Sequence, residues 1–314
     1  MAKQCPYGII PLLMFLQQLI NGLTLGGVYA LVALGYTMVY GILELINFAH
    51  GEIYMLGAYI GIIALGLFTA WGWTETAPVP SLLAAVAVAA VYCGAVGATV
   101  ERLAYRPLRR AHRLTPLISA IGMSIVLQNV VMLTQGSADK VFPRLSDAPT
   151  TFDVAGATVS ALQLWIVGVS AALMGGLHLL IRRTRLGLAM RATAQDPRMA
   201  GLVGIPVDRV ISATFVIGSA LAAVAGVMVG LYYGVANFFI GYVAGIKAFT
   251  AAVLGGIGNV PGAMLGGVIL GVLEGLGAGY LSNEYKDVIA FVILIVVLIV
   301  RPTGLMGERV PDKV

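Results

Sequence analysis

Long stretches without a single charged residue constrain this chain more than any other feature. Ser81–Val100 and Val288–Val300 contain no charge at all, and a helix needs about 20 apolar residues to cross the hydrocarbon core of a bilayer. Hydrophobic residues make up 59% of the chain and charged residues 11%, against about 25% charged residues in an ordinary soluble domain. The sequence therefore predicts an all-α polytopic membrane protein.

Nine apolar segments are candidate membrane spans, and we expect eight or nine transmembrane helices in a single domain covering residues 1–314. The first segment is long for one helix and the seventh is short. The forty glycines agree with this interpretation, because small residues let helices approach closely in lipid. The N-terminal apolar stretch continues into further membrane sequence, so we interpret it as a retained first span and not as a signal peptide. The nine segments are about Leu12–Gly41, Gly51–Ala70, Ser81–Val100, Thr115–Thr134, Ala161–Ile181, Val210–Tyr233, Val243–Gly256, Ala263–Gly279 and Val288–Val300.

The distribution of arginine indicates which loops face the cytoplasm. Residues 101–113 carry five arginines and residues 182–209 carry six, while the tail adds Arg301, Arg309 and Lys313. The intervening loops, 71–80, 135–160 and 280–287, hold six acidic residues and three basic ones. By the positive-inside rule the arginine-rich loops and the C-terminus are cytoplasmic. The side of the N-terminus stays open, because Lys3 alone is a weak signal.

The longest outward segment is the periplasmic loop at about 135–160. Pro143, Pro149 and Gly156 are typical of a loop, and a short hairpin would fit between them. An inert connection is the favoured interpretation, and a cap that touches an external partner is the alternative.

A short polar stretch, Gln195–Pro206, lies inside the largest cytoplasmic loop, at about 182–209. Asp196 followed by Pro197 predicts a helix start, and Gly204 predicts its end about two turns later. Met199, Leu202 and Val203 would share one apolar face. A helix this short needs a partner for that face. The partner is either the chain's own membrane-facing surface or a groove on another protein.

Four charges lie within or at the rims of the predicted spans, where burial costs roughly 3 kcal/mol per charge on insertion scales. They are Glu44, Glu52, Lys247 and Glu274. The first two belong to a polar cluster that also contains Asn47 and His50. An ordinary turn at the membrane surface is one interpretation of this cluster. The other is a broken or re-entrant segment whose side chains line a water-accessible path.

A second irregular segment, Lys247–Gly267, joins two short apolar halves. The glycines of its turn and Asn259 disfavour a continuous straight helix. One interrupted apolar segment in each half of a chain points to a pseudo-symmetric transport pathway.

Several functions are disfavoured by the motifs that are missing from the sequence. No GxxxxGK[ST] sequence occurs, so the chain has no phosphate-binding loop for ATP. No HExxH, CxxC or complete GxSxG sequence occurs either, and we therefore expect no catalytic residues, no metal site and no cofactor. The formal charge of +5 lies in short loops between spans, which does not indicate a nucleic-acid partner.

Long motifs in the chain resemble the LivH-type permeases of branched-chain amino acid ABC transporters. The resemblance extends over nearly the whole chain and is weakest at Met1–Pro11 and Gly136–Ser160. The motifs that carry it are NGLTLGGVYALVALGYTMVYGILELINFAHGEIYMLGAY (Asn21–Tyr59), ERLAYRPLR (Glu101–Arg109), LISAIGMSIVLQN (Leu117–Asn129), RATAQDPRMAGLVGIPVDRVISATFVIGSALAAVAGV (Arg191–Val227), KAFTAAVLGGIGNVPGAMLGGVILG (Lys247–Gly271) and YLSNEYKDVIAFVILIVVLIVRPTGLMG (Tyr280–Gly307).

The resemblance implies an ABC importer permease fold in a bacterial inner membrane. It also implies a LivM-type second permease, two cytoplasmic ABC ATPase subunits and a periplasmic leucine/isoleucine/valine-binding protein as partners, besides the lipid bilayer. The coupling helix that docks on an ATPase would then include Ala194, Gln195, Asp196, Pro197, Met199, Ala200, Leu202, Val203 and Gly204. The family's Glu-Ala-Ala sequence is replaced here by Ala194-Gln195-Asp196, whereas Gly204 keeps the expected glycine.

A zwitterionic substrate with an apolar tail needs a few polar groups among aliphatic walls. As path-lining residues we predict Tyr36, Asn47, His50, Glu52, Gly255, Gly256, Gly258 and Asn259. They would form a permissive conduit if selectivity rests with the binding protein. The alternatives are a urea or short-chain amide importer of the same fold, and a secondary transporter or channel that works without an ATPase.

Overall fold

The computed structural model describes residues 9–109, 111–112, 114–143, 151–154 and 156–307. Lys3, Arg110, Arg113, Arg144, Pro149, Arg309 and Lys313 lie outside these residues. The described helices are α1 (Ile9–Leu43), α2 (His50–Ala70), α3 (Trp73–Thr76), α4 (Pro78–Val100), α5 (Leu114–Gln135), α6 (Ala161–Arg183), α7 (Arg185–Gln195), α8 (Pro197–Leu202), α9 (Val207–Tyr233), α10 (Ile240–Gly255), α11 (Val260–Tyr280) and α12 (Lys286–Val300), with short π or 3-10 turns at η1 (Glu101–Tyr105), η2 (Arg106–Leu108) and η3 (Asn283–Tyr285). The strands are β1 (Lys140–Val141), β2 (Thr151–Val154), β3 (Ala157–Ser160) and β4 (Val235–Ala236).

Each of the nine predicted spans coincides with a helix, which confirms the all-α membrane class. Within the described residues, seven helices are long and apolar enough to cross a membrane. The two others, α10 and α12, have 16 and 15 residues. The first span, which is long for one helix, is nevertheless a continuous helix of 35 residues.

Helix α1 forms the centre of the bundle and packs most extensively against α11. Glycines line both sides of this contact. A Cβ atom on Gly22 would lie 2.7 Å from the Cα atom of Val272, and one on Gly26 would lie 2.9 Å from the Cα atom of Val268. Facing them, Gly271 and Gly275 are just as tightly enclosed by the backbone of α1. These small residues allow the close backbone approach that stabilises helix pairs in lipid.

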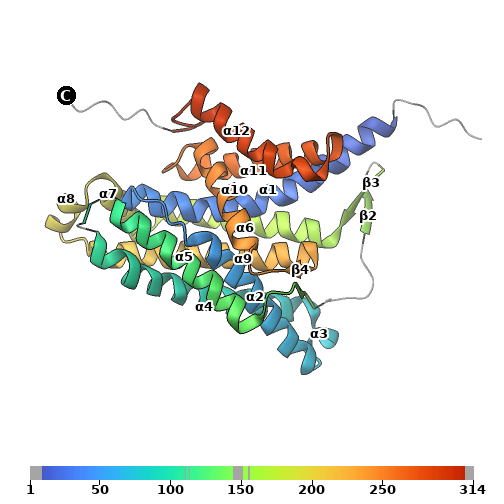
Figure 1. The fold of residues 1–314 in the computed structure, drawn as a ribbon, viewed down its shortest axis with the longest axis horizontal. Coiled ribbons are helices and arrows are strands. Elements are labelled where there is room, and N and C mark those ends of the chain that lie inside the picture. The colour runs from blue at the N-terminus through green and yellow to red at the C-terminus, as the bar shows by residue number, and fades with distance from the viewer. Residues whose placement is uncertain (1–8, 110, 113, 144–150, 155, 308–314) are drawn as a thin grey trace, which may run out of the picture.

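The two ends of the bundle carry the two classes of loop that the charge distribution distinguishes. Helices α7 and α8, the α4–α5 connection and the described end of the chain gather at one end, whereas α3 and the β2–β3 hairpin lie at the other (Figure 1). Because the arginine-rich loops gather at the first end, we call it the arginine end and the other the hairpin end. Helix α1 begins at the hairpin end, where Gln17 hydrogen-bonds Thr158 of the hairpin.

Two segments that were treated as loops contain regular structure. The outward loop includes the antiparallel β2–β3 hairpin, as expected, and β1 pairs with β4. The loop at 182–209 is mostly helical, and the sequence analysis missed α7. Its start is capped by Thr184, whose hydroxyl accepts a hydrogen bond from the amide of Gly187.

Helices α5 and α6 form much of the outer flank of the bundle. Most of the apolar side chains of α5 are exposed, among them Ile118, Ile125 and Leu133. Exposed apolar helices of this length are what lipid or a neighbouring membrane subunit would cover.

Candidate functional site

The connection between α1 and α2 turns back into the bundle. Helix α1 ends at Leu43, and Glu44 adopts a left-handed backbone with φ of 53°. Helix α2 begins at His50, whose buried ring contacts Gly35 so closely that a Cβ atom there would collide with it. Gly35 lies eight residues before the end of α1, which is about 12 Å along a helix. The start of α2 is therefore buried well inside the bundle, as expected for a re-entrant segment.

The four polar residues predicted near this connection are all buried. Tyr36, Asn47, His50 and Glu52 each expose 4% or less of their surface. The rings of Tyr36 and His50 meet edge to face, with centroids 4.9 Å apart. The structure thus brings Tyr36, from the first span, to the start of α2, where the sequence had already grouped Asn47, His50 and Glu52.

The hydrogen bonds of this cluster are incomplete. The hydroxyl of Tyr105 donates to Oδ1 of Asn47 at 3.0 Å, and the hydroxyl of Ser124 donates to Oε1 of Glu52 at 3.2 Å. Among the described residues, no partner is found for Nδ2 of Asn47, Nε2 of His50 or Oε2 of Glu52. Burial of a polar atom without a hydrogen-bond partner costs free energy. We therefore expect each of these atoms to meet water, a ligand or a new partner in a second conformation. These unpartnered atoms can bind a polar ligand if the surrounding helices separate.

The α10–α11 turn, which contains the other predicted path residues, lies at a different depth. Helix α10 ends at Gly255, while Gly256 and Gly258 have φ of 107° and 91°, values that favour glycine. A Cβ atom on Gly41, near the end of α1, would lie 3.7 Å from Gly258. The turn is therefore at the arginine end, and the structure does not bring it together with His50.

Asn259 fixes this turn through both ends of its side-chain amide. Its Oδ1 accepts a hydrogen bond from the amide of Gly262 at 3.0 Å, which caps α11. Its Nδ2 donates to the carbonyl of Met306 at 2.9 Å, and the amide of Met306 donates to the carbonyl of Gly255. The end of the chain is thereby tied to the turn.

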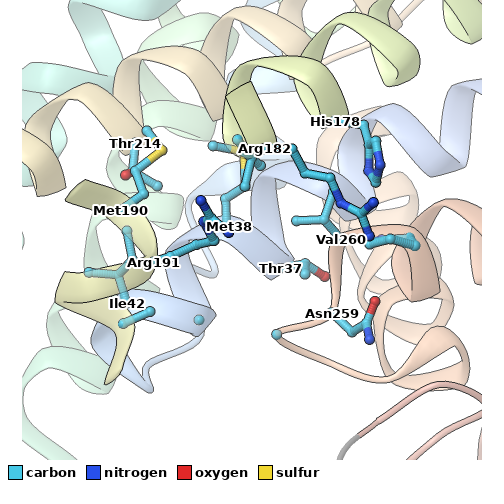
Figure 2. A pocket seen from close by; sticks show the side chains of 15 residues that line it. Thr37, Met38, Ile42, His178, Arg182, Met190, Arg191, Thr214, Asn259 and Val260 are labelled. Carbon is cyan, nitrogen blue, oxygen red and sulfur yellow. The ribbon is translucent and has the colours of Figure 1, made fainter. Parts of the chain in front are cut away.

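A cavity of about 410 Å³ opens beside this turn and connects two groups of predicted residues. Gly258 and Asn259 line it on one side, and Ala194 of α7 lines it on another. Arg182 and Arg191, from different helices, extend over the same hollow, with Thr37 between them and Asn259 (Figure 2). A hollow with two guanidinium groups and a hydroxyl can receive a carboxylate.

The sequence analysis missed His178, Arg182 and Arg191 as members of a site. A signal was available, because His178 and Arg182 stand four residues apart and so share one face of α6. The sequence analysis used Arg182 and Arg191 only to assign their loop to the cytoplasmic side of the membrane.

The short helix predicted after Asp196 is present as α8 and has the expected cap. Oδ1 of Asp196 accepts hydrogen bonds from the amides of Arg198 and Met199 at 2.8 and 3.1 Å, and Gly204 follows with φ of 87°. Ala200 is buried, but Leu202 and Val203 are 81% and 76% exposed. Met199 is 61% exposed, so the apolar face of α8 is not packed on the chain itself. Ala194 and Gln195 end α7 just before this helix.

Comparisons with known proteins identify the family of the chain. The model of the family described as branched-chain amino acid transport system / permease component matches residues 18–298. The high-affinity branched-chain amino acid transport system permease protein BraD of Pseudomonas aeruginosa is 54% identical, over 96% of this chain and 98% of its own length. LivH of Escherichia coli K12, which carries the same description, is 51% identical over the same shares. A probable LivH of Methanocaldococcus jannaschii is 28% identical over 88% of each chain.

No solved structure matches the chain. The family model covers most of the sequence, and its relatives are transport permease proteins. This chain therefore belongs to the family of permease components of branched-chain amino acid transport systems.

Proposed function

We propose that this chain is the permease subunit of a binding-protein-dependent ABC importer that carries leucine, isoleucine and valine across a bacterial inner membrane. The single observation that carries the proposal is the identity of 54% and 51%, over nearly full length, to permeases whose names specify branched-chain amino acids. A LivM-type second permease, two cytoplasmic ATPases and a periplasmic binding protein complete the importer. The C-terminus then lies in the cytoplasm, with the arginine end of the bundle.

Uptake measurements test the substrate. Cells that lack their own branched-chain importers receive this chain together with the proposed partner subunits from the same organism, and uptake of labelled leucine is compared with uptake of urea. We expect saturable leucine uptake that unlabelled isoleucine and valine inhibit and urea does not. Uptake of urea without leucine would favour the urea or amide importer instead. Leucine uptake that persists without the ATPase genes would favour a secondary transporter.

The coupling residues are the second part of the proposal. Within an importer of this kind, the exposed apolar face of α8 would insert into a groove on an ATPase subunit. Leu202 and Val203 supply most of that face. Ala194, at the end of α7 just before α8, lines the cavity beside the α10–α11 turn. A push on α8 would then reach the cavity lining through α7. The buried cluster at the start of α2 would line the path that this motion opens.

Substitution of Gly204 tests the coupling. A β-branched residue with φ of 87° is strained by about 1–3 kcal/mol, although a Cβ atom there would meet no neighbour. Gly204→Val should therefore misdirect α8 without disturbing the bundle, and leucine uptake should fall while ATP hydrolysis continues. Gly136→Val is the matched control, because Gly136 is equally open and also has a left-handed backbone, with φ of 89°, but lies in the outward loop far from α8. Normal uptake in Gly204→Val would refute the coupling assignment.

A further inference from the structure

An ion cluster at the junction of three helices is not part of the site described above. Nζ of Lys247, on α10, lies 2.9 Å from Oε1 of Glu274 on α11 and 2.7 Å from Oδ1 of Asp287 on α12. Lys247 and Glu274 are buried, whereas the side chain of Asp287 is 55% exposed. One cation therefore holds two carboxylates of unequal burial, and the exposed one is the easier to replace.

The buried carboxylate of this cluster has spare capacity. Oε2 of Glu274 has no hydrogen bond of normal length in the described part of the chain, although the hydroxyl of Tyr29 lies beside this carboxylate. A carboxylate oxygen of a residue that is only 1% exposed normally has at least one donor. The ammonium group of Lys247 contacts Oε1 of Glu274 and Oδ1 of Asp287 but does not reach Oε2 of Glu274. An additional cationic donor would complete the arrangement.

Two hollows adjoin the ion cluster. One, of about 400 Å³, is lined by Lys247 and by aliphatic side chains such as Leu25, Val229 and Val243. The other, of about 250 Å³, is lined by Glu274 and, on its rim, by Lys286 of α12. Leu25 and Tyr233 belong to both linings. The larger hollow is near the lower limit of ligand sites, which measure about 300–1,000 Å³, so it suits a small molecule with an apolar part.

The position of these hollows suits a substrate that arrives from outside. Tyr233 is the last residue of α9, and Gln18 and Asn21 of the smaller hollow belong to the half of α1 that begins at the hairpin end. This end holds the outward loops, whereas the cavity near Arg182 and Arg191 opens at the arginine end. The two sites therefore occupy opposite halves of the bundle.

We propose that Lys247, Glu274 and the adjoining aliphatic hollow form an outer binding site for a zwitterionic aliphatic α-amino acid. The carboxylate of the ligand replaces Asp287 on Lys247, its ammonium group binds Oε2 of Glu274, and its side chain enters the hollow beside Val243. The exchange is balanced in charge, because a zwitterion adds no net charge to the buried group. The site gives the permease a specificity element of its own, in contrast to a permissive conduit.

This inference rests on the proposed function for its substrate class, and a pair of neutral variants separates a substrate site from a structural ion pair. Lys247→Met alone leaves Glu274 charged and buried without the ammonium group that pairs with it, which destabilises a protein whether or not the site binds substrate. The double variant Lys247→Met/Glu274→Gln removes both charges, so a purely structural pair predicts that transport recovers. We expect the double variant to assemble in the membrane with its partner subunits and to lose leucine uptake by at least about tenfold. Lys140→Met/Glu284→Gln, outside both hollows, is the matched control.

Protection from chemical labelling tests occupancy directly in the assembled transporter. A cysteine at Val243 would be labelled by a maleimide, with Cys5 replaced by serine and with Cys93 left in place because it is buried. Leucine should slow the labelling of Val243→Cys, and urea should not. A cysteine at Val141, which is 73% exposed near the hairpin end, should be labelled at the same rate with and without leucine.

The outcomes distinguish the site from the proposed function. Leucine protection together with loss of uptake in the double variant supports the site. Uptake that is normal in the double variant, or labelling that leucine does not slow, overturns the site while leucine uptake by the unaltered chain keeps the proposed function. Protection by leucine in a chain that imports none would overturn the proposed function and keep the site.

Discussion

The two connections that interrupt the helices near α1 are built in opposite ways. The α1–α2 connection, residues 44–49, turns back into the bundle and delivers buried polar atoms of Asn47, His50 and Glu52 that have no partner among the described residues. The α10–α11 turn, residues 256–259, stays at the arginine end, and Asn259 satisfies its neighbours with both amide atoms. Both sequences contain glycine and asparagine. The α1–α2 connection nevertheless leads to polar atoms without hydrogen bonds, whereas both amide atoms of Asn259 in the α10–α11 turn are hydrogen-bonded.

The difference indicates which connection changes during transport. Unpartnered buried groups raise the free energy of the state that contains them, so they favour a second state in which water or substrate reaches them. A capped turn that also holds the end of the chain gains nothing from opening. We infer that the α10–α11 turn acts as a fixed base at the arginine end, and that the start of α2 is the part that opens.

The largest effect is expected from crowding the start of α2. A Cβ atom on Gly51 would lie 2.9 Å from the Cα atom of Gly245 and would collide with the carbonyl oxygen of Gly241. Overpacking of this kind typically costs about 1–3 kcal/mol, and here only backbone could move. Gly51→Ala should lower the thermal stability of the purified permease complex and reduce leucine uptake by about tenfold or more, since 1.4 kcal/mol corresponds to a factor of ten.

The same helix offers a control for this crowding. Gly66 has open space where a Cβ atom would stand, so Gly66→Ala should leave uptake unchanged and slightly favour the helix. If both variants behaved like the unaltered chain, the contact between α2 and α10 would not be as tight as described. The start of α2 would then not be tightly enclosed, in contrast to its description above.

A smaller effect, confined to transport, is expected from the unpartnered carboxylate. In Glu52→Gln the amide oxygen can still accept the hydrogen bond from Ser124, while the charge is lost. Because Oε2 has no partner to lose, the thermal midpoint of the complex should change little. Leucine uptake should fall several-fold if Glu52 meets a polar guest in the open state. Uptake and thermal midpoint that fall together would mean that Glu52 has a structural role instead.

The sequence predicted the class of fold and the cap of α8 because both depend on local information. Apolar runs with at most one charge identified all nine apolar helices, and Asp196 with Pro197 predicted the start of α8 correctly. Helix α7 was missed because the arginines in and around it were interpreted as loop residues, and because its stability depends on contacts with the bundle. Three of its members are buried, Gly187, Met190 and Thr193.

The candidate site was only partly predictable. Polar residues inside apolar sequence indicated that Asn47, His50 and Glu52 matter, since burial at that depth requires a reason. Their depth relative to the α10–α11 turn could not be derived, because it depends on how far residues 44–49 turn back along α1. The pairing of Lys247 with Glu274 joins positions 27 residues apart on different helices. It depends on how α10 and α11 are aligned along each other, and the pattern of apolar residues in the sequence does not determine that alignment.

The smallest effect is expected at the tied turn and concerns stability alone. Asn259→Ala removes the cap of α11 and the bond to Met306, and loss of an N-cap typically costs about 1 kcal/mol. Asn259→Asp keeps an oxygen for the amide of Gly262 but loses the donor to Met306, so it separates the two contacts. We expect a clear fall in the thermal midpoint for Asn259→Ala, a smaller fall for Asn259→Asp, and leucine uptake close to normal in both at a temperature well below the midpoint. If Asn259→Ala instead abolished uptake without lowering the midpoint, this turn would take part in the motion, and the α10–α11 turn and the start of α2 would have to be regarded as two halves of one gate.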